Sequence, residues 1–157
     1  MTIKHNDKYV QVEFGSNMTE KFVNNWKPGG TLIGVSGRWG SKVESKGSDI
    51  MGRWSWVDLR GKHNTQIRAI SAYRVHQDFI KDAGELTSCK QQVRSMMAKG
   101  IKNPNPMKAF LQDLTTFIQT WRDKGKQHEI ILMADMNEYE LGVDNQGSKK
   151  AGEAVGE

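Results

Sequence analysis

The spacing of apolar residues changes twice along this chain, and this change constrains the fold more than any other feature. In 8–14 and 53–61 apolar and polar residues alternate, which is typical of a half-buried strand. Across 107–121 apolar residues recur every three or four positions, which indicates a helix covering another layer. A continuous apolar run, 130–133, then follows. This order predicts an α+β domain in which a helix packs on a mostly antiparallel sheet.

The same patterns give the expected elements. The predicted strands are 8–14, 31–36, 53–61, 65–75 and 129–134, and the predicted helices are 88–100 and 106–124. Asn105 and Pro106 suit the N-cap and first position of the second helix. We expect 37–52 to be a loop and 61–64 to close a hairpin. Residues 142–157 lack large apolar side chains, which predicts a flexible polar tail after a domain at 1–141.

The charge balance is basic, with 23 Lys and Arg against 18 Asp and Glu and a net charge of +5. Such a balance favours a polyanionic partner such as nucleic acid, although it also serves solubility alone. No run approaches the ~20 apolar residues of a membrane span, and no secretory signal is visible. Cys89 is the single cysteine, so it forms no internal disulfide. We expect an intracellular protein without a membrane partner, and a nucleic-acid ligand would suit a nuclear location. Its oligomeric state is open.

Polar residues follow the apolar run 130–133 at once. Asp135 and Asn137 lie two positions apart, so on a regular strand they point the same way. A carboxylate and an amide placed in this way can hold one water and one phosphate oxygen. The alternatives are a turn or capping carboxylate at Asp135 and an Asx-turn at Asn137 that closes a buried strand.

Four segments together suggest a family. In chain order they are GGTLIGVSGRW (29–39), MGRWSWVDLRG (51–61), TQIRAISAYRV (65–75) and MADMN (133–137). This ordered set resembles the endonuclease/exonuclease/phosphatase superfamily, and most closely its retroelement-type endonuclease branch. The resemblance implies a four-layer α/β/β/α sandwich, a Mg²⁺ cofactor and cleavage of phosphodiesters. Ala134 departs from the glycine that usually precedes the family's aspartate.

The resemblance also implies roles for three residues. Asp135 would polarise the attacking water, Asn137 would donate its amide to the scissile phosphate, and Tyr73 would place its hydroxyl near that phosphate. For Tyr73 the alternative is an ordinary strand tyrosine whose hydroxyl has a partner.

Arginine and tryptophan side chains could grip the nucleic acid, because both residue types bind backbones and stack on bases. The candidates are Arg38, Arg53 and Arg74, with Trp39 and Trp54 as stacking residues. For the two tryptophans the alternative is core packing.

Parts of the family's site have no counterpart here. Only 28 residues precede Gly29 and 22 follow Asp135, and all four histidines come before Asp135. The metal-binding glutamate and the catalytic histidine of the family are therefore unmatched, and the metal ligands stay unknown. Glu13 lies on an early strand, where an exposed glutamate is the simpler interpretation.

We therefore expect a partial domain, and whether it is an enzyme stays open. The leading hypothesis is a Mg²⁺-dependent endonuclease or phosphodiesterase acting on nucleic acid, DNA rather than RNA, with reduced or no activity. One alternative is a non-catalytic nucleic-acid-binding remnant. The other is a member of the phosphatase branch acting on small phosphorylated molecules.

Overall fold

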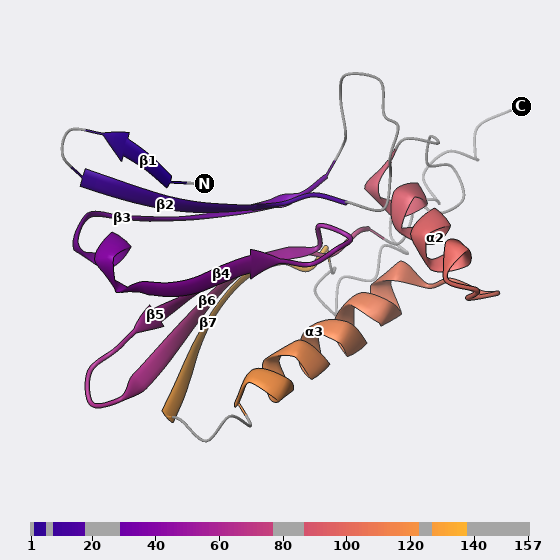
Figure 1. Cartoon of the computed structure of the whole chain (residues 1–157). Coiled ribbons are helices and arrows are strands. Elements are labelled where there is room, and N and C mark those ends of the chain that lie inside the picture. The colour runs from indigo at the N-terminus through magenta and orange to yellow at the C-terminus, as the bar shows by residue number, and fades with distance from the viewer. Residues whose placement is uncertain (1, 6–7, 18–28, 77–86, 123–126, 138–157) are drawn as a thin grey trace, which may run out of the picture.

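A computed structural model of the protein describes residues 2–5, 8–17, 29–76, 87–122 and 127–137. These residues form two β-sheets stacked on one another, with one long helix on the outer face of the second sheet (Figure 1). The predicted α+β class is confirmed. The predicted tail, 142–157, lies outside the described residues.

The first sheet is antiparallel, and its order follows the chain. Its strands are β1 (Thr2–His5), β2 (Lys8–Gly15) and β3 (Thr31–Ser36). The predictions for β2 and β3 are confirmed, whereas the short strand β1 was not predicted.

The second sheet also follows chain order. Its strands are β4 (Val43–Ser48), β5 (Trp54–Arg60), β6 (Thr65–Tyr73) and β7 (Gln127–Asp135). β5 and β6 form the predicted hairpin, and positive φ angles at His63 and Asn64 match the tight turn that such hairpins prefer. β7 pairs with β6 in parallel, so their carboxyl ends meet at one edge of the molecule.

The prediction of a loop at 37–52 is wrong. A 3-10 helix, η1 (Gly37–Lys42), leads there into strand β4, which pairs with β5. β4 has little apolar alternation because most of its side chains are partly or fully exposed. Its backbone pairing, rather than burial of its side chains, holds it in the sheet.

Alternating side chains of the second sheet build two cores. Val57, Leu59 and Ala69 face the first sheet and pack with Ile33 of β3. Trp54, Ile70 and Ala72 face the other way and pack against a helix. The placement of the tryptophan and of the aliphatic residues of β5 on opposite faces follows directly from the strand's alternation.

The helix on the second face is α3 (Pro106–Arg122), close to the predicted 106–124. Asn105 caps it, since its Oδ1 accepts the backbone N–H of Lys108 at 3.0 Å. Phe110 and Leu114 come from its apolar stripe and reach the core against Trp54. Another helix, α2 (Ser88–Ala98), lies near one end of the sandwich (Figure 1).

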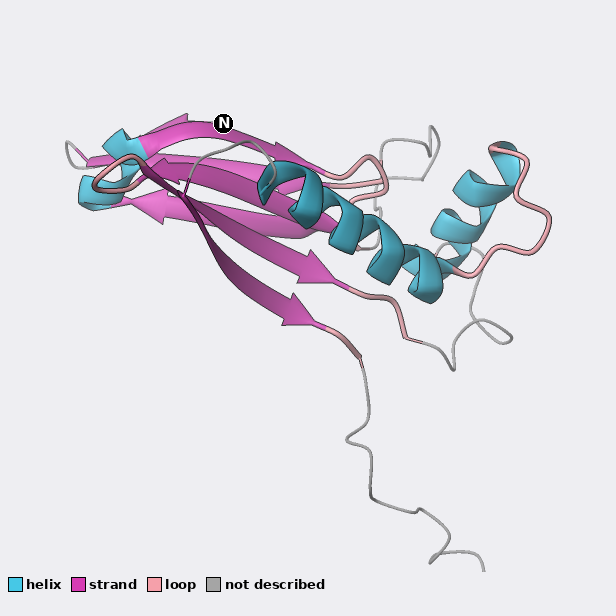
Figure 2. Cartoon of the chain, turned by 90° about the horizontal axis from the view of Figure 1, so that it is seen from below, coloured by secondary structure: helices cyan, strands magenta, loops and turns pink. Residues whose placement is uncertain are grey.

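β7 is not the buried strand that its apolar run predicts. β2 packs over β4 and β5, and β3 packs over β5 and β6, so the first sheet stops short of β7. Ile131, Leu132 and Met133 are 51%, 45% and 50% exposed. β7 is the last strand of its sheet among the described residues, and Figure 2 shows it at the sheet's outer side.

Among the described ranges, neither helix is both long and apolar enough to cross a bilayer.

Candidate functional site

Two predicted site residues end neighbouring strands. Tyr73 is the last residue of β6, Asp135 is the last of β7, and the two are paired in the parallel register. Paired residues on adjacent strands point to the same face of a sheet, so both side chains leave on the side of the first sheet. The backbone N–H of Arg74 donates to the carbonyl of Asp135 at 2.9 Å and carries the pairing one residue further.

An Asx-turn closes β7. Asp135 Oδ1 accepts the backbone N–H of Asn137 at 3.1 Å, and Asn137 has a φ of 47°. The Asn137 side chain donates through Nδ2 to the carbonyl of Arg74 at 2.6 Å, which ties the end of β7 to β6. Both side chains therefore have a structural role. One amide N–H of Asn137 and one carboxylate oxygen of Asp135 remain beyond these bonds, so a further contact to a ligand is possible.

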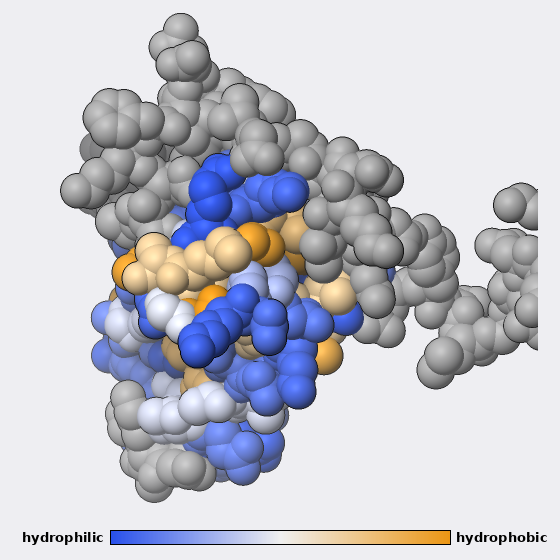
Figure 3. All heavy atoms as spheres, turned by 90° about the vertical axis from the view of Figure 1, so that its right-hand side faces the viewer, coloured by the Kyte–Doolittle hydropathy of each residue, from blue (hydrophilic) through white to orange (hydrophobic). Residues whose placement is uncertain are grey.

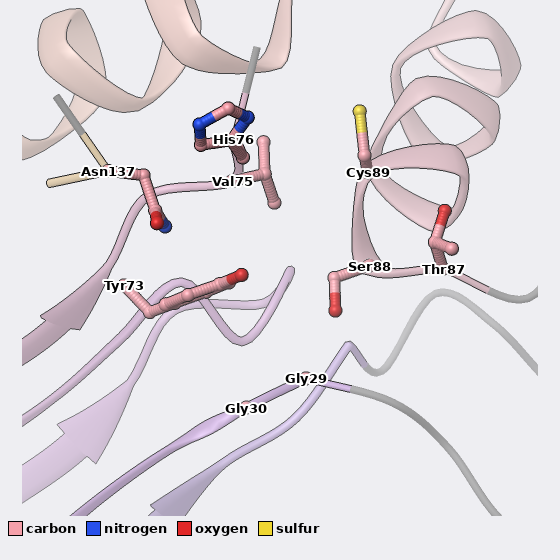
Figure 4. A pocket seen from close by; sticks show the side chains of 9 residues that line it. All are labelled: Gly29, Gly30, Tyr73, Val75, His76, Thr87, Ser88, Cys89 and Asn137. Carbon is pink, nitrogen blue, oxygen red and sulfur yellow. The ribbon is translucent and has the colours of Figure 1, made fainter. Parts of the chain in front are cut away.

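A cavity of about 470 Å³ opens beside these strand ends. Tyr73 and Asn137 line it together with His76, and Ser88 closes the opposite side from α2 (Figure 4). Asp135 is exposed and is not part of the lining. Seen from the α2 end of the molecule, the described surface is mostly hydrophilic, with a narrow hydrophobic band (Figure 3).

The Gly29-Gly30 pair allows the start of β3 to approach this cavity closely. Gly29 has a φ of 81°, and a Cβ there would collide with the side chain of Ser88. Gly30 has a φ of 126°, and its Cβ would lie 2.7 Å from the carbonyl oxygen of Gly15. A side chain at position 29 would press on α2 and one at position 30 would press on β2, so either would shift the start of β3 beside the cavity.

The N-terminus of α2 forms the far wall of the cavity. Thr87 is the N-cap, and its Oγ1 accepts the backbone N–H of Lys90 at 3.4 Å. The first N–H groups of a helix have no partner within the helix, and they carry a partial positive charge that favours anions. Cys89 is 4% exposed, and burial raises the pKa of its thiol, so it is held in the neutral form that is a poor nucleophile.

His76 and the α2 residues of this cavity were not predicted from the sequence. His76 follows the predicted strand 65–75 directly and lines the same cavity as Tyr73. Its position one residue after a predicted strand that carries a candidate tyrosine could have marked it. Thr87 and Ser88 are brought in by the packing of α2, for which the sequence gives no local pattern.

Two of the three predicted arginines are buried. Arg53 is 3% exposed and binds Asp49 and Asp113 at 2.7 and 2.8 Å. Burial alone would lower the pKa of Arg53, but the hydrogen bonds and charges of the two aspartates raise it. Arg74 is 9% exposed, and its Nη1 lies 3.4 Å from the carbonyl oxygen of Met136. Neither guanidinium is available to grip a nucleic-acid backbone.

The two tryptophans have different surroundings. Trp54 is 5% exposed and packs on Phe110, so for Trp54 the core interpretation is right. Trp39 is 46% exposed in η1, and the guanidinium of Arg38 lies 5.6 Å from its ring centroid. η1 lies at the end of the sandwich opposite to α2 (Figure 1).

The described residues do not fit a Mg²⁺ ion. Magnesium takes octahedral oxygen ligands, usually including one or two carboxylates. At this end Asp135 offers one carboxylate, half of which is used in the Asx-turn. Within the described ranges no three His, Cys, Asp or Glu side chains come together as a metal site. Glu13 lies on β2 with its side chain 20% exposed and 3.7 Å from Lys46, so it is a partly buried, paired glutamate and not the exposed one expected.

Comparisons of the chain with protein-family models, with curated proteins and with solved structures gave no match. The resemblance to the endonuclease/exonuclease/phosphatase superfamily therefore stays a prediction. Chemically, the cavity combines a hydroxyl, an amide, an imidazole and a helix N-terminus, and this set can hold an anion such as phosphate.

Proposed function

We propose that this chain is a nucleic-acid-binding domain of the metal-dependent phosphodiesterase type, with the four-layer sandwich of that superfamily. The cavity beside Tyr73 and Asn137 would hold the phosphodiester. One observation carries the proposal: Tyr73, His76 and Asn137 line the same cavity that the N-terminus of α2 bounds.

Each of these groups has a role that suits a phosphate. The hydroxyl of Tyr73 and the remaining amide N–H of Asn137 would donate to phosphate oxygens, as would the first N–H groups of α2. His76 would exchange a proton with the phosphate or its leaving group, because its ring nitrogens can both donate and accept a proton. Asp135, at the rim, would orient water through its second carboxylate oxygen.

Cleavage by this set alone should be slow. Metal-assisted hydrolysis relies on charge neutralisation and on a nucleophile formed at neutral pH. A Mg²⁺ ion would need oxygen ligands beyond the described residues, because Asp135 alone does not provide its coordination. We therefore expect the chain to bind DNA and to nick it poorly.

The test combines binding and cleavage on one substrate. Supercoiled plasmid is incubated at low salt with and without Mg²⁺, using wild type, Tyr73→Phe and Asp135→Ala. Expected are gel shifts that weaken with salt, as phosphate contacts require, and little nicking. Fast nicking that disappears in Asp135→Ala would show a competent nuclease and overturn the expected weak activity. No binding at any salt would overturn the proposal itself.

The size of the cavity favours a second candidate. Its volume of about 470 Å³ is in the range of small-molecule sites, which suits a phosphorylated small molecule of the phosphatase branch. Two chromogenic esters separate the candidates. Hydrolysis of bis(p-nitrophenyl) phosphate supports the diesterase, whereas hydrolysis of p-nitrophenyl phosphate alone, lost in Tyr73→Phe, supports a phosphatase.

A further inference from the structure

A second concave site lies at the other end of the sandwich. η1 and the β5–β6 turn enclose a cavity of about 480 Å³ there. Its lining includes four cationic side chains, one tryptophan and one isoleucine, which are Arg38, Lys42, Arg60, Lys62, Trp39 and Ile67. Nothing in the roles proposed for Tyr73, Asp135 and Asn137 uses these residues.

The charge of this cavity has one sign. All four cationic residues are exposed, and no acidic residue lines the cavity among the described residues. Glu44 is the acid nearest to η1 in sequence, and its carboxylate accepts a hydrogen bond from Gln66 at 3.1 Å. Four cations around one hollow repel one another, and a bound anion would remove that repulsion.

An exposed aromatic face lies among the cations. Trp39 is 46% exposed and belongs to neither of the two large cores. Arg38 lies over its ring, and the partly buried Ile67 adds an apolar surface to the lining. Aromatic rings beside cationic side chains are the usual means by which proteins stack a base and hold its phosphate.

The backbone on both sides of the cavity is fixed. In η1 the Ser41 hydroxyl donates to the carbonyl of Arg38 at 3.1 Å. In the β5–β6 turn the N–H of Thr65 donates to the carbonyl of Lys62 at 2.9 Å, and the N–H of Gly61 donates to the carbonyl of Thr65 at 2.8 Å. The backbone of the site is therefore pre-organised before a ligand binds, which lowers the entropy cost of binding.

We propose that this cavity binds an unpaired nucleotide. The base would stack on Trp39, and the phosphates would contact Lys42, Arg60 and Lys62. A duplex is disfavoured because its bases are stacked on one another and offer no free ring face to Trp39. The ligand chemistry is a nucleotide with an accessible base, either free or within a single strand.

The two sites are far apart. β6 contributes Ile67 to this cavity and ends six residues later at Tyr73, in the candidate phosphodiester site. At about 3.3 Å per residue the separation along the strand is roughly 20 Å. The proposal shares with the proposed function only a nucleic-acid ligand, and each site can be altered without touching the other.

The test measures fluorescence anisotropy of a short labelled oligothymidylate and of a blunt duplex of the same length. Wild type should bind the single strand more tightly than the duplex. Trp39→Ala should weaken single-strand binding about tenfold, since base stacking on an aromatic ring is lost. Lys42→Gln/Lys62→Gln should lower the slope of log affinity against log salt by about 1.4, that is about 0.7 for each contact.

Matched variants make the outcome specific. Lys99→Gln/Lys108→Gln removes the same charge from exposed positions on other elements and should leave binding close to wild type. Trp39→Ala should cause the same loss of affinity in a Tyr73→Phe background as in wild type, which separates this proposal from the proposed function. Circular dichroism checks that Trp39→Ala folds.

Four results would overturn the proposal. These are equal affinity for duplex and single strand, wild-type affinity in Trp39→Ala, equal losses in both lysine pairs, and binding to phosphatidylserine vesicles but not to the oligonucleotide. Competition by thymidine monophosphate at concentrations similar to the strand would assign the site to a free nucleotide. Weaker competition would assign it to a strand, and both support a nucleotide site.

Discussion

Asp58 and Arg68 face each other across β5 and β6 as a buried ion pair held by two hydrogen bonds, at 2.6 and 2.7 Å. They are 3% and 5% exposed. The guanidinium lies 4.1 Å from the ring centroid of Trp56 and 4.5 Å from that of Trp121, so it joins the sheet to α3.

Arg68→Met should lower the free energy of unfolding by about 3–5 kcal/mol, because it leaves the Asp58 carboxylate buried without a counter-charge. Urea denaturation measures the change. The double variant Asp58→Leu/Arg68→Met should recover much of the loss, since it removes both charges. Arg60→Met, at an exposed position of the same hairpin, should change stability by no more than about 0.5 kcal/mol. A loss for Arg68→Met as small as that of Arg60→Met would contradict the prediction.

Arg53→Met should destabilise the protein without weakening nucleic-acid binding by the folded fraction. Arg53 is buried and paired with the buried side chain of Asp49 and the half-exposed one of Asp113, so it supports the fold and is not exposed to a phosphate. Breaking a buried pair by removing one partner costs about 3–5 kcal/mol. Thermal melting gives the stability, and anisotropy at low temperature gives the affinity. Arg38→Met, at an exposed position, should weaken nucleic-acid binding and leave the melting temperature unchanged. Equal effects of the two variants on affinity and on melting temperature would contradict the prediction.

Asn137→Ala should reduce stability more than Asn137→Gly. Both variants lose the hydrogen bond to the carbonyl of Arg74, worth about 0.5–1.5 kcal/mol. Alanine at a φ of 47° also adds about 1–2 kcal/mol of backbone strain, which glycine avoids. Denaturant titration of the two variants measures the difference. If the two variants melt alike, residue 137 does not hold the left-handed conformation in solution.

Cys89 should react slowly with thiol reagents, and the protein should lose stability at alkaline pH through this residue. Burial raises the pKa of the Cys89 thiol, so the folded state holds its proton more tightly than the unfolded state does. The contribution of the Cys89 thiol to the free energy of unfolding is fully present below the pKa of this thiol in the unfolded chain, about 8.5. It is lost as the pH rises through the pKa of the thiol in the folded protein. Ellman's reagent at about pH 8 measures the rate, with glutathione as reference. Cys89→Ser should flatten the alkaline part of the stability profile, and an unchanged profile would rule out this source.

The strength of the periodic pattern decided which elements could be predicted. α3 and the β5–β6 hairpin carry regular apolar spacing because each has one buried face, and their predicted bounds agree closely with the structure. β4 has no fully buried face, so the spacing of its apolar residues does not indicate that it pairs with β5. For β7 the apolar run predicted the strand correctly but not its exposure, because burial depends on how far the neighbouring layer extends.

The residues of the candidate site also differ in whether the sequence could predict their positions. Tyr73 and Asn137 line one cavity, as their places near predicted strand ends suggest, whereas Asp135 pairs with Tyr73 but lies outside the lining. Arg53 could not be assigned, because one of its two partners, Asp113, is sixty positions away on α3. Ser88 reaches the cavity only through the packing of α2 against the start of β3, which no local sequence pattern encodes.

The outer edge of β7 has a consequence for the protein in concentrated solution. Among the described residues its backbone N–H and C=O groups on that side have no strand beside them, and Ile131 and Met133 stand exposed along it. An uncovered apolar edge is a template for further strands, which is how ordered aggregates begin. We therefore expect the protein to associate through this strand at high concentration in spite of the net charge of +5. A lysine at position 131 would act as a gatekeeper, extending shelf life without disturbing either candidate site.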